Sequence, residues 1–209
     1  MRSKPPKPSA RQADSRTGSA AKQPLGLRII GGRFRGRRLL YGGDPRVRPM
    51  KDRVREAIFN LIGTDLQGKL AVDLFAGTGA LGLEAVSRGA ARAVMIEQHF
   101  PTAAIIRQNV AALGAEDLVE IVTSNVFIWQ QREPDLGPLP RVVFCSPPYE
   151  FYVSRTEEVL RLIGGLLESA PAGSVFVVES DDRFDFGLLP DAATWDLRQY
   201  PPAMVGLYR

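Results

Sequence analysis

Two prolines that end an apolar run are the first feature of this chain whose residue types suggest chemistry. Residues 142–145 (VVFC) read as a buried strand, and the run stops at Ser146-Pro147-Pro148-Tyr149. The prolines fix φ and remove two N–H donors, which leaves a stiff loop whose carbonyl groups are unpaired. Such a loop suits a target that is itself a hydrogen-bond donor. An exocyclic amino group of a nucleobase can donate one hydrogen to the Ser146 hydroxyl and the other to the Pro147 carbonyl.

These contacts predict chemistry on the nitrogen of the amino group. They draw the nitrogen toward tetrahedral geometry and localise its lone pair. Tyr149 can stack on the base and hold its amino group in line with the group that reacts with it. No general base of high pKa is required, because positioning and desolvation do most of the work. The competing interpretation is that the prolines only terminate a strand and that Tyr149 is a packed ring. One histidine, His99, and one cysteine, Cys145, argue against a Cys/His metal site and rule out an internal disulfide.

A glycine-rich loop is the second motif. The stretch GTGALG at 77–82 has G-x-G-x-x-G spacing, follows an apolar run and opens a helical stretch. Glu97 lies twenty residues after Gly77, at the end of the next predicted strand. Glycines let the backbone approach a ligand closely, and an acid at this distance accepts hydrogen bonds from ribose hydroxyls. The arrangement predicts a ligand that contains adenosine.

Two adenosine ligands fit this loop. A nicotinamide dinucleotide would make the protein an oxidoreductase, but it would leave the proline loop and the basic N-terminal region unexplained. With S-adenosyl-L-methionine, the acid after the second strand would hold the ribose. Asp73 and the turn Phe75-Ala76-Gly77 would then face the methionine part of the ligand. An alternative role for Asp73 is to cap a helix or to stabilise the turn.

The elements that must position these loops alternate between strands and helices from residue 70 onward. The predicted strands are 70–75, 93–97, 119–123, 141–145 and 174–179, and the predicted helices are 81–87, 101–113, 126–131 and 155–167. Alternation at this spacing is typical of a parallel, doubly wound sheet, which binds ligands at the carboxyl ends of its strands. The last two runs, TWDLRQY and AMVGLYR, have no helix between them and predict an antiparallel hairpin at the sheet edge.

The N-terminal region differs in charge from the rest of the chain. Residues 1–55 contain 16 Lys and Arg and 3 acidic residues, whereas the remaining 154 residues contain 11 and 20. Residues 1–24 lack hydrophobic periodicity and predict a disordered basic tail, with an organellar transit peptide as the alternative. The stretch LRIIGGRFRGRRLLY predicts two short strands around Gly31-Gly32, and residues 51–62 predict a helix. A basic arm on an acidic body indicates an anionic polymer as partner.

Several blocks of the sequence together resemble the RsmD family, bacterial enzymes that methylate the N2 amine of a guanine in 16S ribosomal RNA. The resemblance spans residues 27–209 and is carried by LRIIGGRFRGRRL, RPMKDRVREAIFNLI, VDLFAGTGALGLEAVSRGA, IE at 96–97, SPPY and VVES. It implies an α/β fold with a doubly wound, mostly parallel, seven-stranded Rossmann-like sheet over residues 63–209. Residues 25–62 would form a small RNA-facing hairpin and helix.

The resemblance also implies how the protein works and where. The cofactor would be S-adenosyl-L-methionine, and the substrate would be 16S rRNA within the small ribosomal subunit or its assembly intermediate. The enzyme would be cytoplasmic and monomeric, without a metal and without contact with a membrane.

Roles for individual positions follow from the same resemblance. The cofactor-binding residues that it implies are Asp73, Phe75, Ala76, Gly77, Thr78, Gly79, Glu97, Gln98, Asn125 and Val126. The catalytic residues against the target base would be Ser146, Pro147, Pro148 and Tyr149. The RNA-facing residues would be Arg33, Arg35, Arg37, Arg38 and Arg53.

Two positions depart from the family's usual pattern. Ser146 stands where the family usually has Asp or Asn, and serine is found at this place in some cytosine-N4 DNA methyltransferases. Met50 stands where the family usually has Thr, and it cannot hold the cofactor by a hydroxyl. Two alternatives therefore stay open. One is methyl transfer to the N4 amine of cytosine in DNA or RNA, and the other is an inactive RNA-binding assembly factor.

Overall fold

The computed structural model describes residues 26–44 and 49–209. The predicted disordered tail, residues 1–24, lies outside the described residues. The sheet has seven strands in the order β3-β2-β1-β4-β5-β7-β6. Strands β3, β2, β1, β4 and β5 are parallel, and β7 is antiparallel to both of its neighbours. The prediction of a doubly wound, mostly parallel sheet that ends in an antiparallel hairpin is confirmed.

The observed elements follow the predicted alternation, and most ends differ from the prediction by one or two residues. The strands are β1 (Leu70–Asp73), β2 (Arg92–Ile96), β3 (Val119–Val122), β4 (Arg141–Cys145), β5 (Val175–Ser180), β6 (Asp196–Tyr200) and β7 (Ala203–Tyr208). The helices are α1 (Asp52–Ile62), α2 (Ala80–Ser87), α3 (Phe100–Leu113), α4 (Val126–Gln131), α5 (Phe151–Ser154) and α6 (Thr156–Glu168). The short helix α5 has no counterpart in the prediction.

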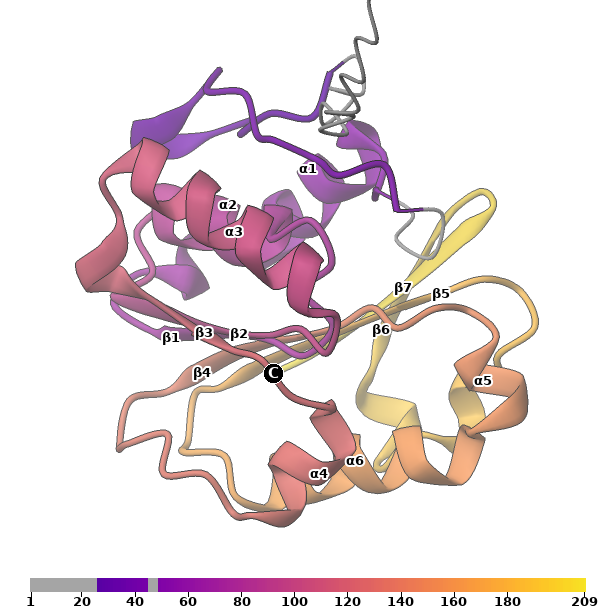
Figure 1. Cartoon of the computed structure of the whole chain (residues 1–209). Helices are drawn as coiled ribbons and strands as arrows, with labels where there is room; N and C mark the ends of the chain where they lie inside the picture. The colour runs from indigo at the N-terminus through magenta and orange to yellow at the C-terminus, as the bar shows by residue number, and fades with distance from the viewer. Residues whose placement is uncertain (1–25, 45–48) are drawn as a thin grey trace, which may run out of the picture.

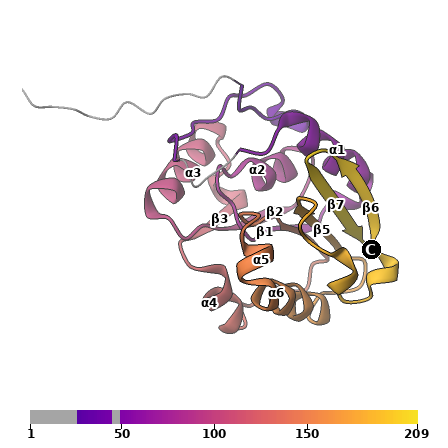
Figure 2. The same ribbon diagram turned by 90° about the vertical axis from the view of Figure 1, so that its right-hand side faces the viewer.

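Helices cover both faces of the sheet. Helices α1, α2 and α3 lie on one face, and α4 and α6 lie on the other (Figures 1 and 2). In β4, Val142 and Phe144 belong to the core under the first layer, whereas Val143 and Cys145 belong to the core under the second. This two-sided burial explains why the strands read as continuous apolar runs. It also leaves only the strand ends free to form a site.

The segment from residue 26 to 44 forms a short antiparallel pair where the sequence predicted two strands. Its arms, residues 27–29 and 37–39, meet in one bridge between Arg28 and Arg38. The Ile29 N–H donates to the Arg37 carbonyl and the Leu39 N–H to the Leu27 carbonyl, each at 2.9 Å. The chain turns between the arms through a short 3₁₀ helix, η1 (Gly32–Phe34), so the predicted hairpin around Gly31-Gly32 is confirmed in a shortened form. Next to the arms, the backbone N–H groups of Ile30 and Gly31 bond to a carboxylate of helix α2 and do not extend the pairing.

That carboxylate, Glu84, fixes the N-terminal segment to the sheet layer. It accepts hydrogen bonds of 2.7 Å from the N–H groups of Ile30 and Gly31, and it pairs with Arg88 at 2.7 Å and Arg55 at 3.8 Å. Glu84 and Arg55 are both fully buried, and burial lowers the pKa of the Arg55 guanidinium. Because a buried charge is stable only when it is paired, these contacts make the segment an integral part of the fold.

Gly32 gives a test of this docking. It has φ +74°, and a Cβ there would overlap the carbonyl oxygen of Ser87. We expect Gly32→Ala to lower the free energy of unfolding by roughly 3 kcal/mol, because a left-handed conformation without glycine and a backbone clash add together. Gly36→Ala is the matched control, since Gly36 has φ +81° but open space around it. Equal losses in urea unfolding of the two variants would contradict the close contact.

Candidate active site

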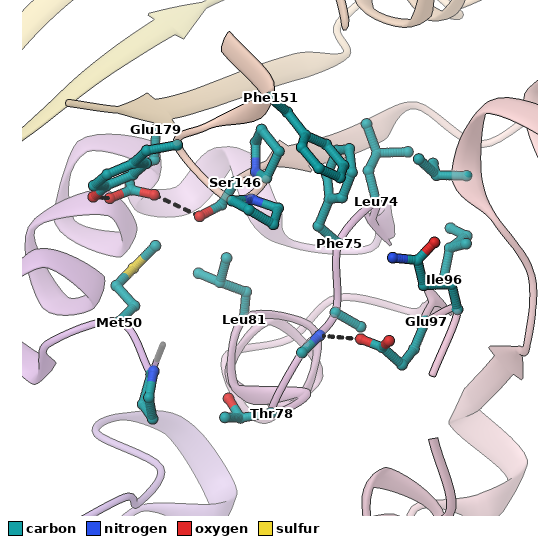
Figure 3. A pocket seen from close by; sticks show the side chains of 18 of the residues that line it. Met50, Leu74, Phe75, Thr78, Leu81, Ile96, Glu97, Ser146, Phe151 and Glu179 are labelled. Carbon is teal, nitrogen blue, oxygen red and sulfur yellow. Dashed lines mark hydrogen bonds between the residues drawn. The ribbon is translucent and has the colours of Figure 1, made fainter. Parts of the chain in front are cut away.

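A cavity of about 710 Å³ opens at the carboxyl ends of the central strands. Its walls come from the loops after β1, β2, β3 and β4, from the end of β5, from residues 49–51 before α1 and from residues 202–203. Figure 3 shows the glycine-loop side, with Thr78 and Glu97, and the opposite side, with Ser146 and Glu179. The two motifs singled out in the sequence therefore meet in one cavity, although about seventy residues separate them.

Glu97 holds the glycine loop in shape. One carboxylate oxygen accepts the Gly77 N–H at 2.9 Å, and the other accepts the His99 N–H at 2.7 Å. Gly77 has φ +51°, in the left-handed region. The Glu97 side chain lines the cavity while the residue is only 8% exposed. A carboxylate has about four lone-pair positions, so it can accept two further hydrogen bonds from ribose hydroxyls.

The loops after β2 and β3 form the next wall. The Asn125 carboxamide oxygen accepts the Phe127 N–H at 3.0 Å and so caps α4. The Asn125 amide nitrogen donates to the Gln98 carboxamide oxygen at 3.4 Å. Gln98, Asn125 and Val126 all line the cavity, and adenine binding by the first two stays a prediction. The carboxamide groups of Gln98 and Asn125 meet between the ends of two strands.

Three aromatic rings line the cavity next to this wall. The ring centroids of Phe75 and Phe127 are 6.1 Å apart, those of Phe75 and Phe151 are 6.1 Å apart, and the third pair is 6.3 Å apart. The Arg155 guanidinium lies over Phe127, 4.2 Å from the ring centroid. Together these rings present an apolar surface, and single ring faces or edges of this kind can contact a purine ring.

Asp73 and Gly79 support the loop from behind the cavity wall. One oxygen of Asp73 accepts the Gly82 N–H at 3.1 Å near the start of α2, and the other has no partner among the described residues. Burial raises the pKa of Asp73 to about 7, and the nearby charge of Glu97 adds to the shift. Gly79 has φ +75°, and a Cβ there would come within 2.9 Å of Ile106. The hydrogen bond from Gly82 fits the helix-capping role of Asp73, and neither Asp73 nor Gly79 is part of the cavity lining, so their cofactor contacts stay a prediction.

The proline loop forms the opposite wall around Glu179 (Figure 3). The Ser146 hydroxyl donates to one oxygen of Glu179 at 2.5 Å, and the Tyr149 hydroxyl donates to the other. The Pro148 carbonyl accepts the Phe151 N–H at 2.8 Å, which starts α5. The loop is therefore held at both ends, and Ser146, Pro147, Pro148 and Tyr149 all line the cavity.

The predicted RNA-facing arginines are exposed but lie in two places. Because α2 and α3 begin at the cavity, their last residues lie at the opposite edge of the sheet. Gly32 lies against Ser87 at the end of α2, and Arg37 donates to the Ala112 carbonyl at the end of α3. The loop that carries Arg33, Arg35, Arg37 and Arg38 thus lies roughly 12 to 20 Å from the cavity, as the lengths of α2 and α3 indicate. Arg53 lies instead in the first turn of α1, two residues after Lys51 in the cavity wall.

Comparison with known proteins assigns the chain to a family. The model of the family described as Conserved hypothetical protein 95 matches residues 27–199. The chain belongs to this family. A curated relative from Escherichia coli, named Ribosomal RNA small subunit methyltransferase D, is 37% identical over 188 residues, which are 88% of each chain. These findings confirm the resemblance to the RsmD family and support the predicted methyltransferase activity.

Solved structures agree with this assignment at the level of the fold. The structure of a hypothetical protein of Thermus thermophilus superposes with a TM-score of 0.70 and 28% identity, and covers 88% of this chain and 99% of that one. An RNA methyltransferase from Salinibacter ruber, solved with S-adenosyl-L-homocysteine, has a TM-score of 0.57 and 23% identity over 77% of this chain and 92% of that one. At that identity it shows a shared fold alone.

Many cavity residues of this family member were missing from the predicted site, and three of them bear on the chemistry. Glu179 is the last but one residue of β5, and Lys51 and Arg183 supply positive charges to the lining. Glu179 could have been found, because VVES at 177–180 is an apolar strand that ends on an acid at the same edge of the sheet. Lys51 lies in the block RPMKDRVREAIFNLI, next to Met50, but nothing in that block marks it as a cavity residue, and Arg183 lies in a segment without a motif. Met50 also lines the cavity with its thioether (Figure 3).

Metal ligands do not gather anywhere in residues 26–44 and 49–209. No group of three or more His, Cys, Asp and Glu side chains there could hold a metal ion. No helix of that part of the chain is long and apolar enough to cross a membrane.

Proposed function

We propose that this protein transfers a methyl group from S-adenosyl-L-methionine to the N2 amine of a guanine in small-subunit ribosomal RNA. The observation that carries the proposal is the single cavity that joins the Glu97 glycine loop to the loop from Ser146 to Tyr149. The relatives named for small-subunit rRNA methylation supply the substrate class. Methyl transfer to an amine, the chemistry of the family, fits a site that offers hydrogen-bond acceptors to an amino group.

The residues of one half of the cavity fit the cofactor. The volume of about 710 Å³ lies within the 300–1,000 Å³ range of small-molecule sites. Glu97 offers free lone pairs to the ribose, Gln98 and Asn125 offer polar groups to the adenine, and the rings beside them offer an apolar surface. When bound, the cofactor supplies an electrophilic methyl group on its sulfonium.

The other half of the cavity positions the amine. The Ser146 hydroxyl oxygen and the Pro147 carbonyl oxygen accept its two hydrogens, and the Tyr149 ring stacks on the base. Because both acceptors belong to a stiff loop, the nitrogen is held for attack without a strong base. The apolar rings of Phe75 and Phe151 exclude water from one side.

The surface outside the cavity suits RNA. We propose that residues 25–62 face the RNA, with Lys51 and Arg53 beside the target nucleotide and the arginine loop at 33–38 on a more distant part of the same RNA. The substrate in this proposal is the small subunit or an assembly intermediate, and the enzyme is a cytoplasmic monomer that needs no metal. A protein of this size has little room for a separate target-recognition domain. Recognition of the folded shape of the RNA can supply the specificity instead.

The deciding experiment is methyl transfer from labelled S-adenosyl-L-methionine to small subunits that lack the modification. After digestion to nucleosides, we expect the label in N2-methylguanosine. Label in N4-methylcytidine would overturn the choice of base. Bound cofactor without any transfer would instead identify an inactive RNA-binding protein.

Glu97→Ala tests the cofactor half of the cavity. We expect the Kd for S-adenosyl-L-methionine to rise about 10- to 100-fold, because hydrogen bonds to a charged group contribute about 1.5–3 kcal/mol. Isothermal calorimetry measures this Kd, and Glu120→Ala, on the exposed edge of β3, is the control. An unchanged Kd in a folded Glu97→Ala protein would contradict the ribose role.

Salt dependence tests the distant arginine loop. Replacing Arg33, Arg35 and Arg38 with alanine should reduce the slope of log K against log salt by about 0.7–0.9 for each phosphate that the variant no longer binds. Filter binding to the small-subunit RNA at several salt concentrations measures the slope. The control removes Arg132 and Arg161, exposed arginines near the α4 and α6 layer. Equal slopes in all three proteins would exclude the loop from the RNA interface.

A further inference from the structure

We infer that Glu179 is a positioning residue that turns the Ser146 hydroxyl into a pure hydrogen-bond acceptor for the target amine. The inference rests on the proposed function, because it concerns how the same cavity holds an amino group. It assigns a role to a residue at the end of β5, outside the proline loop and outside the glycine loop.

The backbone of Glu179 is held from two sides. It pairs with Val205 in the β5–β7 ladder, and its carbonyl oxygen accepts the Tyr152 hydroxyl at 3.0 Å. The residue is 6% exposed and its side chain lines the cavity. Because its backbone is fixed in this way, the Glu179 carboxylate can orient rotatable hydroxyl groups through hydrogen bonds.

The carboxylate accepts a hydrogen bond from each of two hydroxyls. The Ser146 hydroxyl donates to it at 2.5 Å, and the Tyr149 hydroxyl donates to its second oxygen (Figure 3 shows the Ser146 bond). A carboxylate only accepts, so both hydroxyls are forced to act as donors toward it. Hydrogen bonds of this charge-assisted kind are short and about twice as strong as neutral ones.

The consequence for Ser146 follows from the inventory of a hydroxyl group. A serine hydroxyl has one proton and two acceptor positions, and in isolation the proton rotates to suit its surroundings. With that proton directed to Glu179, the side that faces the cavity presents lone pairs alone. An incoming amino group, which offers hydrogens, therefore meets an acceptor and never a competing donor. The charge of Glu179 also raises the electron density on the Ser146 oxygen.

The same carboxylate orients the stacking ring. A tyrosine ring can pivot about its side-chain bonds, but a hydrogen bond at the far end removes much of that freedom. Tyr149 is held through its hydroxyl while its ring remains part of the cavity lining. One carboxylate therefore fixes two of the groups that contact the base, the Ser146 hydroxyl and the Tyr149 ring, which lowers the ordering cost of binding.

Glu179→Gln is the first test, because it keeps the shape and removes one acceptor. A carboxamide has one oxygen and one NH₂ group, so one of the two hydroxyls must face a donor. We expect kcat on small subunits to fall about 100-fold, the usual cost of a displaced reacting group. The Kd for S-adenosyl-L-methionine, measured by calorimetry, should stay unchanged. Glu157→Gln, an exposed carboxylate on α6, is the matched control.

Substitutions at position 146 then separate positioning from a merely structural role. Ser146→Asn should retain activity, because its NH₂ group can donate to Glu179 while its oxygen faces the amine. Ser146→Asp alone should lose activity, because two carboxylates would lie in hydrogen-bond distance. Combining Ser146→Asp with Glu179→Gln should restore most of the kcat, because the glutamine NH₂ group can donate to the new carboxylate. A merely structural Glu179 predicts no such rescue.

The outcomes distinguish the inference from the function on which it rests. A wild-type protein that methylates no guanine would refute the proposed function. The contact is then tested without turnover, by a double-mutant cycle of Tyr149→Phe and Glu179→Gln in thermal unfolding, where coupling supports the inference and strict additivity overturns it. With an active wild type, the inference is overturned by a normal kcat in Glu179→Gln, by an equal loss of cofactor affinity, or by failure of the double variant to recover.

Discussion

Replacing Tyr149 with alanine is expected to lower kcat about 100-fold while the Kd for S-adenosyl-L-methionine changes less than about twofold. The ring lines the proline-loop half of the cavity, opposite Glu97, so its loss affects the base and not the cofactor. Without the ring, the base can enter the cavity, but its amino group is no longer held in line with the methyl group of the cofactor. Single-turnover methylation of small subunits and cofactor calorimetry on the same preparation measure the two quantities.

Tyr149→Phe is the control for this prediction. It keeps the stacking surface and removes only the hydroxyl that donates to Glu179. Its kcat should lie between those of the wild type and Tyr149→Ala. If the alanine variant lost cofactor affinity as much as turnover, the ring would belong to the cofactor site and the division of the cavity would be wrong.

Glu84→Ala is expected to cause the largest loss of stability. The change leaves the buried Arg55 guanidinium without its buried carboxylate and leaves the Ile30 and Gly31 N–H groups unpaired. Breaking a buried ion pair on one side costs about 3–5 kcal/mol. For a domain of this size that corresponds to a fall in Tm of roughly 10 °C. Calorimetry or circular dichroism on heating gives the value directly.

A comparison variant isolates the buried network. Glu56→Ala removes an exposed carboxylate from α1, and its Tm should stay close to that of the wild type. The double variant Glu84→Ala with Arg55→Met should be more stable than Glu84→Ala alone, because it removes a buried charge whose remaining ion-pair partner is the partly exposed Asp52. A Tm of Glu84→Ala equal to that of Glu56→Ala would show that the N-terminal segment is held by its other contacts, among them the hydrogen bonds to Ser87 and Asn109, and not by Glu84.

The sheet could be predicted from the sequence because its strands are buried on both faces. Residues 70–73 and 141–145 are short apolar runs with turn signals around them, and the helices between them have their own period. The C-terminal hairpin was equally predictable, because the runs TWDLRQY and AMVGLYR follow each other without enough residues between them for a helix. Helix α5 was missed, since four residues after a proline loop carry no periodicity.

The predicted N-terminal hairpin is present but shorter than two full strands, for a tertiary reason. Residues 27–29 pair with 37–39, as the local pattern around Gly31-Gly32 indicates. The N–H groups of Ile30 and Gly31, which could extend the pairing, are taken by Glu84, which lies more than fifty residues away in the sequence. A local pattern cannot predict a carboxylate that comes from another helix.

The candidate site was predictable where it follows strand ends and less so where side chains share a partner. Glu97 and Ser146 were found from their places after strands, and the structure brings them to one cavity. The sequence weighed two roles for Asp73, and the hydrogen bond from Gly82 favours the capping one. From the sequence, serine at position 146 suggested the loss of a polar group that the family usually has there. The structure places the Glu179 carboxylate beside Ser146, and only the fold brings these two residues together.

The cavity takes wall residues from Asp44 at one end of the described chain and from Pro202 and Ala203 at the other. Strand β7, which begins at Ala203, also fills the place between β5 and β6 in the sheet. A nascent chain therefore has no complete cavity until β7 has left the translating ribosome and folded. A premature stop codon before residue 202 would remove part of the cavity wall and a strand of the sheet, so we expect the fragment to be inactive.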